Sequence, residues 1–319
     1  MRHRTMAACC AAAILAAAFF ASCSRIESLK IRSASVPLGK ELGAKATSAE
    51  TQKLLELCRD IAAFSADRYG LKDQVEALRY LPGHSDGIAW RLTVAPAHSL
   101  KGARVSYYTD KAAAERAARK SEAKGLSAYV EPWDSLGFLG LAPTPLNDSL
   151  AKLSYDRLVE WINRELFSAA IHKGVSDADH DSFVAFAAEV ATRDYLAAKL
   201  TPASPLLGNY ISSKRDERTF ALLFPDFRSR IENLYAQSPL PQDWQKQRDF
   251  LMKTWLQDYR LNYPNRFITN LYSDFGRVQP SDAELASWRE QQPGYEDWNK
   301  RYAAAGSDLR VLLNQMGNP

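Results

Sequence analysis

Two neighbouring segments of the sequence carry the residues whose types and spacing could do chemistry. Arg164, Glu165 and Ser168 lie in a stretch with helical periodicity, and His180 and Asp181 follow a short polar interruption. Residues four apart face the same side of a helix, so positions 164 and 168 could converge on one bound ion, with a carboxylate between them.

The identities of these residues argue against a metal. Catalytic zinc needs three protein ligands drawn from neutral imidazole, carboxylate and thiolate. Arg164 stays protonated and would place a positive charge beside a dication, while the neutral hydroxyl of Ser168 lies outside this ligand set. We predict that Arg164 occupies the cation position and forms a bidentate ion pair that joins the two helices, with Asp181 as its partner and Glu165 also within reach. The alternative is that Arg164 extends from its helix into solvent.

Four stretches of the sequence share a pattern with one bacterial family. They are Tyr108 to Asp110, Asp134 to Phe138, Leu158 to Ser168, and His180 to Phe186. Together they make the chain resemble the bacterial family of predicted zinc aminopeptidases, often lipoproteins, from about Thr47 to the C-terminus. The resemblance implies a zincin-like helical domain and a hydrolase. In that family one helix carries His-Glu-x-x-His for zinc, and an Asn-Glu-Ser-Phe-Ala segment follows on the next helix.

Compared with this family pattern, the sequence replaces the metal ligands and keeps their surroundings. Arg164 and Ser168 stand at the two His positions, Glu165 keeps the general-base position, and Asp181 to Phe183 stand for Glu-Ser-Phe. The resemblance therefore implies that Glu165 is a vestigial general base and that the zinc expected for the family is absent. We interpret the chain as a pseudoenzyme that binds a peptide or a protein partner.

Two further groups of residues belong to this site hypothesis. Tyr108, Ser135 and Phe138 are candidates for lining an inherited substrate cleft. His172 and His180 could supply displaced ligands together with nearby carboxylates, which would make the chain an active metallo-aminopeptidase with remodelled ligands. We favour a structural role, because His172 stands at an expected helix end and the carboxylates at the start of the next helix, where both complement the helix dipoles.

The N-terminus is typical of a bacterial lipoprotein. A basic start and an unbroken run of small and apolar residues over 7–21 lead to Cys23. These features predict a signal peptide over 1–22, because the apolar run is shorter than the ~20 residues of a membrane-spanning helix. The residues before Cys23 resemble a bacterial lipobox. They imply a lipidated tether over 23–46 and an extracytoplasmic protein that is anchored to a bacterial membrane by its lipid.

Residues 47–319 are expected to form one aminopeptidase-like domain of α+β class in which helices predominate. A small strand-containing module over about 85–140 precedes a helical part over about 147–319. Alternating residues predict strands at 88–94, 104–108 and 128–130 around an alanine-rich helix at 110–124. Proline-containing joints divide the helical part near 201–205, 238–241, 263–264 and 279–280.

The first helix of the domain has clear boundaries in the sequence. A capping box at Thr47-x-x-Glu50 begins it, and Gly70 is its stop signal. Cys58 lies among apolar residues at helical spacing and is the one cysteine left once the signal peptide is removed and Cys23 carries lipid. We expect it to pack in the core, with no disulfide in the mature chain.

Composition limits the classes of protein and partner. The chain has 319 residues, of which 46% are hydrophobic and 24% charged, with 15 Gly and 15 Pro, so disordered, collagen-like and coiled-coil proteins are excluded. Lys and Arg number 41 against 37 Asp and Glu, a formal net charge of +4. Because no long basic run occurs beyond the N-terminus, nucleic acid is not an expected partner.

Overall fold

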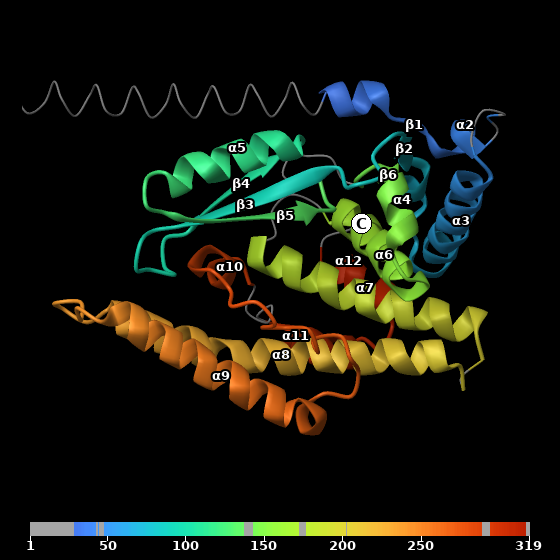
Figure 1. Ribbon diagram of the computed structural model, residues 1–319. Coiled ribbons are helices and arrows are strands. Elements are labelled where there is room, and N and C mark those ends of the chain that lie inside the picture. The colour runs from blue at the N-terminus through green and yellow to red at the C-terminus, as the bar shows by residue number, and fades with distance from the viewer. Residues whose placement is uncertain are drawn as a thin grey trace, which may run out of the picture.

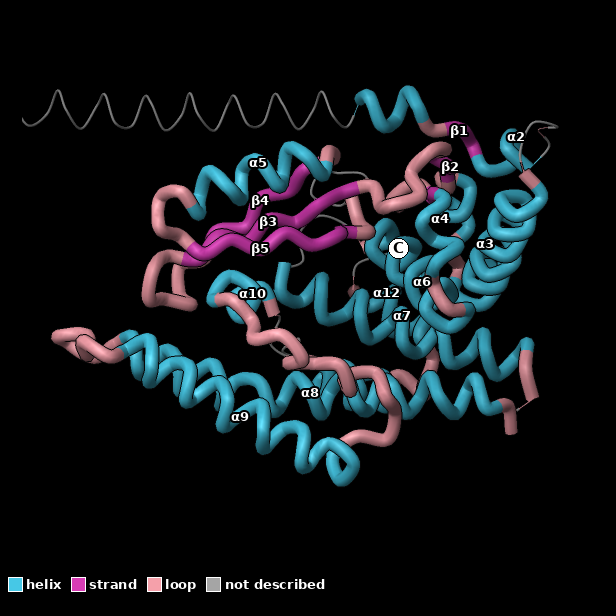
Figure 2. Tube along the Cα trace, viewed as in Figure 1, coloured by secondary structure: helices cyan, strands magenta, loops and turns pink. Residues whose placement is uncertain are grey.

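The computed structural model describes residues 29–42, 44, 48–136, 143–171, 177–201, 203–288 and 294–316, apart from the side chains of residues 177 and 178. The predicted signal peptide, Cys23, Phe138 and His172 lie outside these residues. Helices make up most of the described chain, and its strands are few and short, so the fold is α+β with helices predominating (Figure 2). Within the described ranges, no helix is long and apolar enough to cross a membrane.

A helical segment at 29–34 leads into the other helices and strands, most of which are labelled in Figure 1. In chain order these are β1 (Val36–Pro37), α2 (Leu38–Leu42), α3 (Ala49–Tyr69), α4 (Lys72–Glu76), β2 (Arg79–Leu81), β3 (Ala89–Ala95), β4 (Arg104–Tyr108), α5 (Lys111–Glu122), β5 (Ser127–Trp133), β6 (Leu146–Asn147), the 3-10 helix η2 (Asp148–Lys152), α6 (Tyr155–Ala170), α7 (Asp177–Lys199), α8 (Pro205–Tyr235), α9 (Trp244–Arg266), α10 (Asp282–Ser287), α11 (Tyr295–Ala304) and α12 (Leu309–Gln315).

The three predicted strands are confirmed as one antiparallel sheet with the order β4-β3-β5. Helix α5 packs on one face of this sheet and α10 on the other, above and below it in Figure 1. Asp110 caps α5, because its carboxylate accepts hydrogen bonds from the backbone N–H groups of Ala112 and Ala113. The sheet ends at Trp133, and from there the chain continues directly to the segment that contacts α6.

A second small sheet, which the sequence analysis did not predict, ties the N-terminal segment to the domain. Its order is β1-β2-β6, with β1 antiparallel and β6 parallel to β2. Ile31 and Leu38 are buried against residues of this sheet and its neighbours. Residues 29–42 lie inside the stretch 23–46 that we expected to be a tether, and they form helices and a strand that pack against the domain before the expected start at Thr47.

Helix α3 follows the predicted first helix closely. Its N-cap is Ser48, one residue after the predicted cap, and the Ser48 hydroxyl accepts a hydrogen bond from the Thr51 backbone N–H. The helix stops at Gly70, whose φ of 80° lies in the left-handed region that favours glycine. Cys58 is fully buried in the large core that α3 shares with α6 and α7, as predicted, and burial raises the pKa of its thiol to about 12.

Helices α8 and α9 lie side by side along the lower edge of the molecule in Figure 1. Aromatic rings fill the space between them, for example Phe227 and Trp255, which stack with their centroids 4.4 Å apart. The helix break predicted at 263–264 comes too early, because Pro264 lies inside α9 and the helix continues to Arg266. A proline near a helix end removes few backbone hydrogen bonds, so α9 tolerates it.

Candidate active site

Helices α6 and α7 position the predicted site. Arg164 and Ser168 lie one turn apart on α6, and both are half-buried. His180 of α7 reaches α6, because its Nε2 atom lies 3.4 Å from the backbone carbonyl oxygen of Ser168. Its Nδ1 atom lies 3.4 Å from Oδ1 of Asp181. The structure therefore brings Ser168, His180 and Asp181 together at the junction of the two helices.

Arg164 differs from the prediction. Its guanidinium forms no ion pair or hydrogen bond with any described residue, so the predicted pair with Asp181 is wrong. The Asp181 side chain is 63% exposed and lies beside His180. A carboxylate that keeps most of its hydration gains little from a neighbouring cation, so an ion pair between Arg164 and Asp181 would add little to the contact between the two helices.

Glu165 anchors α6 to the segment that follows β5. Glu165 is 4% exposed, and its carboxylate accepts a hydrogen bond of 2.7 Å from the Thr144 backbone N–H and another from the Ser135 hydroxyl. Pro143 and Pro145 flank Thr144 and have no N–H, so Thr144 supplies the one backbone donor of this tripeptide. Burial raises the pKa of the Glu165 carboxyl, and the hydrogen bonds from Thr144 and Ser135 offset part of that rise.

The same segment contacts α6 at a second point. The Trp161 indole N–H donates a hydrogen bond of 3.1 Å to the backbone carbonyl of Asp134. Of the cleft candidates, the structure therefore places Ser135 at the site, next to Glu165. Tyr108 lies on β4, which β3 separates from β5 and from this segment. Phe138 is outside the described residues.

A buried network of charges lies between α6 and α8, and the sequence analysis did not single it out. Lys214 places its Nζ 2.7 Å from Oε1 of Glu160 and also contacts Glu217. Arg157 contacts both carboxylates and lies 3.3 Å from Glu160 Oε2. The sequence signal of this network is two pairs of oppositely charged residues, each three positions apart on a helix: Arg157 with Glu160, and Lys214 with Glu217.

The network keeps Lys214 and Glu217 ionised. Burial lowers the pKa of the Lys214 ammonium, but the carboxylates of Glu160 and Glu217 outweigh this effect and leave the pKa above its ordinary value. Burial raises the pKa of Glu217, but Lys214 and Arg157 outweigh it and hold that pKa below its ordinary value. These groups satisfy one another, so they stabilise the position of α6 rather than offering a reactive group.

Comparison with known proteins identifies the family. A family model described as "Putative aminopeptidase" matches residues 22–318 of the chain. The chain belongs to the putative aminopeptidase family. No curated protein and no solved structure matches it. The family match begins before β1, so it includes the N-terminal segment that packs against the domain.

In this member of the putative aminopeptidase family, the residues at the expected metal position do not fit zinc. Arg164 supplies a cation and Ser168 a neutral hydroxyl, and neither belongs to the ligand set of catalytic zinc. The Glu165 carboxylate is bound by Thr144 and Ser135. Among the described side chains, no group of three or more His, Cys, Asp and Glu residues is placed to hold a metal ion. The site instead offers a half-buried guanidinium beside Ser168.

Proposed function

We propose that this member of the putative aminopeptidase family acts by binding a peptide or protein ligand at the α6–α7 junction, without catalytic zinc. The observation that carries the proposal is the environment of Glu165. A general base must reach the proton it removes, within a hydrogen bond or through one water. At 4% exposure, and with its carboxylate bound to the Thr144 N–H, Glu165 serves as an anchor of α6. Arg164 and Ser168 beside it replace the metal ligands.

Arg164 gives this site its binding chemistry. A guanidinium presents a planar fork of N–H donors that suits a carboxylate or a carbonyl oxygen. Because Arg164 is half-buried and has no ion-pair partner among the described residues, its donors are available to a ligand. A peptide would bind there through its terminal carboxylate or through an acidic side chain.

Zinc content and hydrolysis together test the absence of catalysis. Purified protein is dialysed against buffer that contains zinc, and its zinc content is measured by inductively coupled plasma mass spectrometry. Release of nitroaniline from aminoacyl nitroanilides is followed in parallel. We expect well below one zinc per chain and no hydrolysis above the buffer rate. A full equivalent of zinc accompanied by hydrolysis would refute the proposal.

Peptide binding tests the role of Arg164. The probes are short alanine-rich peptides with a free or an amidated C-terminus, measured by calorimetry. Loss of a charge-assisted hydrogen bond costs about 1.5–3 kcal/mol, so Arg164→Ala should weaken binding of the free carboxylate roughly 10- to 150-fold. Arg104→Ala on β4, also an arginine with no ion pair among the described residues, is the control and should bind like the wild type. Equal affinities for both variants would contradict the role of Arg164.

The second candidate function is an active metallo-aminopeptidase with displaced ligands. It is favoured by one observation, the approach of His180 to within 3.4 Å of the Ser168 carbonyl, which brings an imidazole to the face of α6. This function predicts a zinc content near one equivalent that is lost in His180→Ala and kept in Ser168→Ala. The binding function predicts that neither substitution changes the low zinc content.

We also propose that the mature protein is a lipoprotein, extracytoplasmic and anchored to a bacterial membrane through Cys23. The support is the signal-like sequence over 1–22. A single acyl chain gives only marginal membrane binding, so the mature N-terminus should carry more than one chain. Mass spectrometry of the N-terminal peptide tests this directly. An unmodified Cys23, or a mature protein that begins elsewhere, would refute the anchor.

A further inference from the structure

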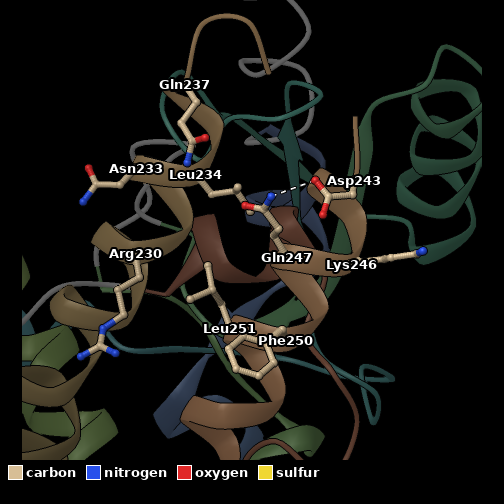
Figure 3. A pocket seen from close by; sticks show the side chains of 9 residues that line it. All are labelled: Arg230, Asn233, Leu234, Gln237, Asp243, Lys246, Gln247, Phe250 and Leu251. Atoms are coloured by element: carbon tan, nitrogen blue, oxygen red, sulfur yellow. Dashed lines mark hydrogen bonds between the residues drawn. The ribbon is translucent and has the colours of Figure 1, made fainter. Parts of the chain in front are cut away.

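A groove lies between α8 and α9, near the loop that joins them and on elements other than those of the α6–α7 junction. Its volume is about 580 Å³, which is within the range of ordinary ligand sites. The nine residues that line it come from the end of α8, the start of α9 and the loop between the two helices, and all are labelled in Figure 3: Arg230, Asn233, Leu234, Gln237, Asp243, Lys246, Gln247, Phe250 and Leu251.

The middle of the groove is apolar. Leu234 of α8 is buried, Leu251 of α9 is half-buried, and their side chains lie between the two helices in Figure 3. Phe250 lies beside them and is 69% exposed, although phenylalanine is one of the residues most often buried in proteins. An exposed aromatic ring next to an apolar floor is typical of an anchor point for a partner.

The outer side of α9 carries positive charge that the described chain does not neutralise. Lys246 and Lys253 precede and follow Phe250 by about one turn each, and neither has an ion-pair partner among the described residues. The acidic residues near the groove are engaged. Asp226 pairs with Arg230 at 2.9 Å, and Asp243 accepts a hydrogen bond of 2.8 Å from the Gln247 amide. The groove therefore has an apolar floor, with Lys246 in its lining and Lys253 about two turns further along α9, and neither lysine is paired with a residue that the structure describes.

We propose that this groove docks an amphipathic helix of a protein partner whose apolar side chains are flanked by Asp or Glu. Two neighbouring helices leave a channel that a third helix fills with residues spaced three, four and seven apart. Such a helix would cover Phe250 and place its acidic residues opposite Lys246 and Lys253. Charge complementarity of this kind fixes the register of the helix and excludes basic partners.

Two other occupants fit the groove less well. A second copy of this chain, docked through the same surface on both molecules, would bring the Lys246 and Lys253 side chains of the two copies toward each other, which is unfavourable for like charges. An anionic membrane would match the charge, but a lipid surface would leave the concave floor at Leu234 and Leu251 unfilled. The helix satisfies both the shape and the charge.

The test uses the full chain and a fluorescent synthetic helix of about 15 residues, with leucines on one face and glutamates beside them. A second peptide has lysine in place of every glutamate. We expect anisotropy to show binding of the acidic peptide, weakened by salt, and about tenfold or greater loss with Phe250→Ser. Leu261→Ser is the matched control, because Leu261 is also on α9 and is 70% exposed but does not line the groove. Its affinity should equal that of the wild type.

Charge reversal makes the result specific. The double variant Lys246→Glu with Lys253→Glu should lose the acidic peptide and prefer the lysine peptide. Equal binding of both peptides to the wild-type chain, or binding that Phe250→Ser leaves unchanged, would overturn the proposal. A dimer in sedimentation that Phe250→Ser dissociates would assign the groove to a second copy. Binding to phosphatidylglycerol vesicles that requires Phe250, in the absence of peptide binding, would assign it to a membrane.

Discussion

Removing the ammonium of Lys214 should destabilise the protein far more than removing a surface ammonium that lies equally close to its own carboxylate partner. Lys214→Met keeps the apolar stem of the side chain and removes the charge. Glu160 and Glu217 would then share Arg157 alone, so the network between α6 and α8 would carry a net negative charge. Lys214 and Glu160 are only 9% and 6% exposed, so water would compensate little of that charge.

The structure supplies a matched comparison for the size of the effect. Lys199 contacts Asp60 at 2.8 Å, almost the same separation as the 2.7 Å between Lys214 and Glu160, but the side chains of Lys199 and Asp60 are 40% and 49% exposed. Removing one partner of a buried ion pair costs about 3–5 kcal/mol. Removing one partner of an exposed pair costs about 0–1 kcal/mol. The difference between the losses of unfolding free energy in Lys214→Met and Lys199→Met therefore measures the effect of burial.

Urea unfolding followed by circular dichroism measures both free energies of unfolding. A loss of about 3–5 kcal/mol in the free energy of unfolding corresponds to a fall in melting temperature of roughly 6–20 °C for a protein of about this size. Adding Glu217→Gln to Lys214→Met makes the network neutral again and should recover part of the loss. Equal destabilisation by Lys214→Met and Lys199→Met would refute the reasoning.

The pH dependence of this difference has a defined sign. Because the folded pKa of Glu217 is held below its ordinary value of 4.5, its contribution to stability is present above about pH 4.5 and is lost as the pH falls through the folded pKa. The gap in stability between the wild type and Lys214→Met should therefore shrink in acid, because a protonated carboxyl no longer needs the ammonium.

Three other outcomes follow from the same contacts. The folded pKa of Glu165 is raised above 4.5, so the free energy of unfolding of the wild type should fall as the pH rises from about 4.5 through that pKa. Glu165→Gln should lack this loss in urea titrations. Parallel curves of stability against pH for the two proteins would contradict it. With the other three cysteines changed to serine, Cys58 should react with Ellman's reagent only on unfolding, because its thiol is buried and has a pKa of about 12; rapid labelling of the folded protein would disprove this. Arg164→His combined with Ser168→His should take up more zinc than the wild type yet stay inactive, because Thr144 still binds the Glu165 carboxylate; nitroanilide hydrolysis by that variant would show that Glu165 is free to act as a base.

Local sequence signals predicted the fold where residues close in the chain decide it. Asp110 and Gly70 mark helix ends by their own chemistry, and alternating side chains located β3, β4 and β5. The sheet of β1, β2 and β6 gave no such signal, because strands of two or three residues show no period. Their pairing joins Tyr80 to Val36 and Leu146, positions far apart in the sequence.

The placement of the candidate residues on helices was predictable from the sequence, and their contacts were less so. Helical spacing and the family resemblance located Arg164 and Ser168 on one face of α6. They did not reveal that Glu165 is bound by Thr144, because which donor reaches a carboxylate depends on the path of a segment that lies 21 residues earlier in the chain. The ion pair predicted for Arg164 was wrong for a related reason. Exposure of Asp181 depends on how α7 packs, and residue type alone does not define it.

Helix α6 explains why binding and stability should be separable in this protein. Successive residues of a helix point about 100° apart, so the neighbouring residues Arg164 and Glu165 can serve different surroundings. Glu165 fixes the helix to the segment after β5, and Glu160 fixes it to α8 through Lys214. Arg164 is held by neither set of contacts. A substitution at Arg164 should therefore change ligand affinity with little effect on unfolding, whereas substitutions at Glu160 should do the reverse.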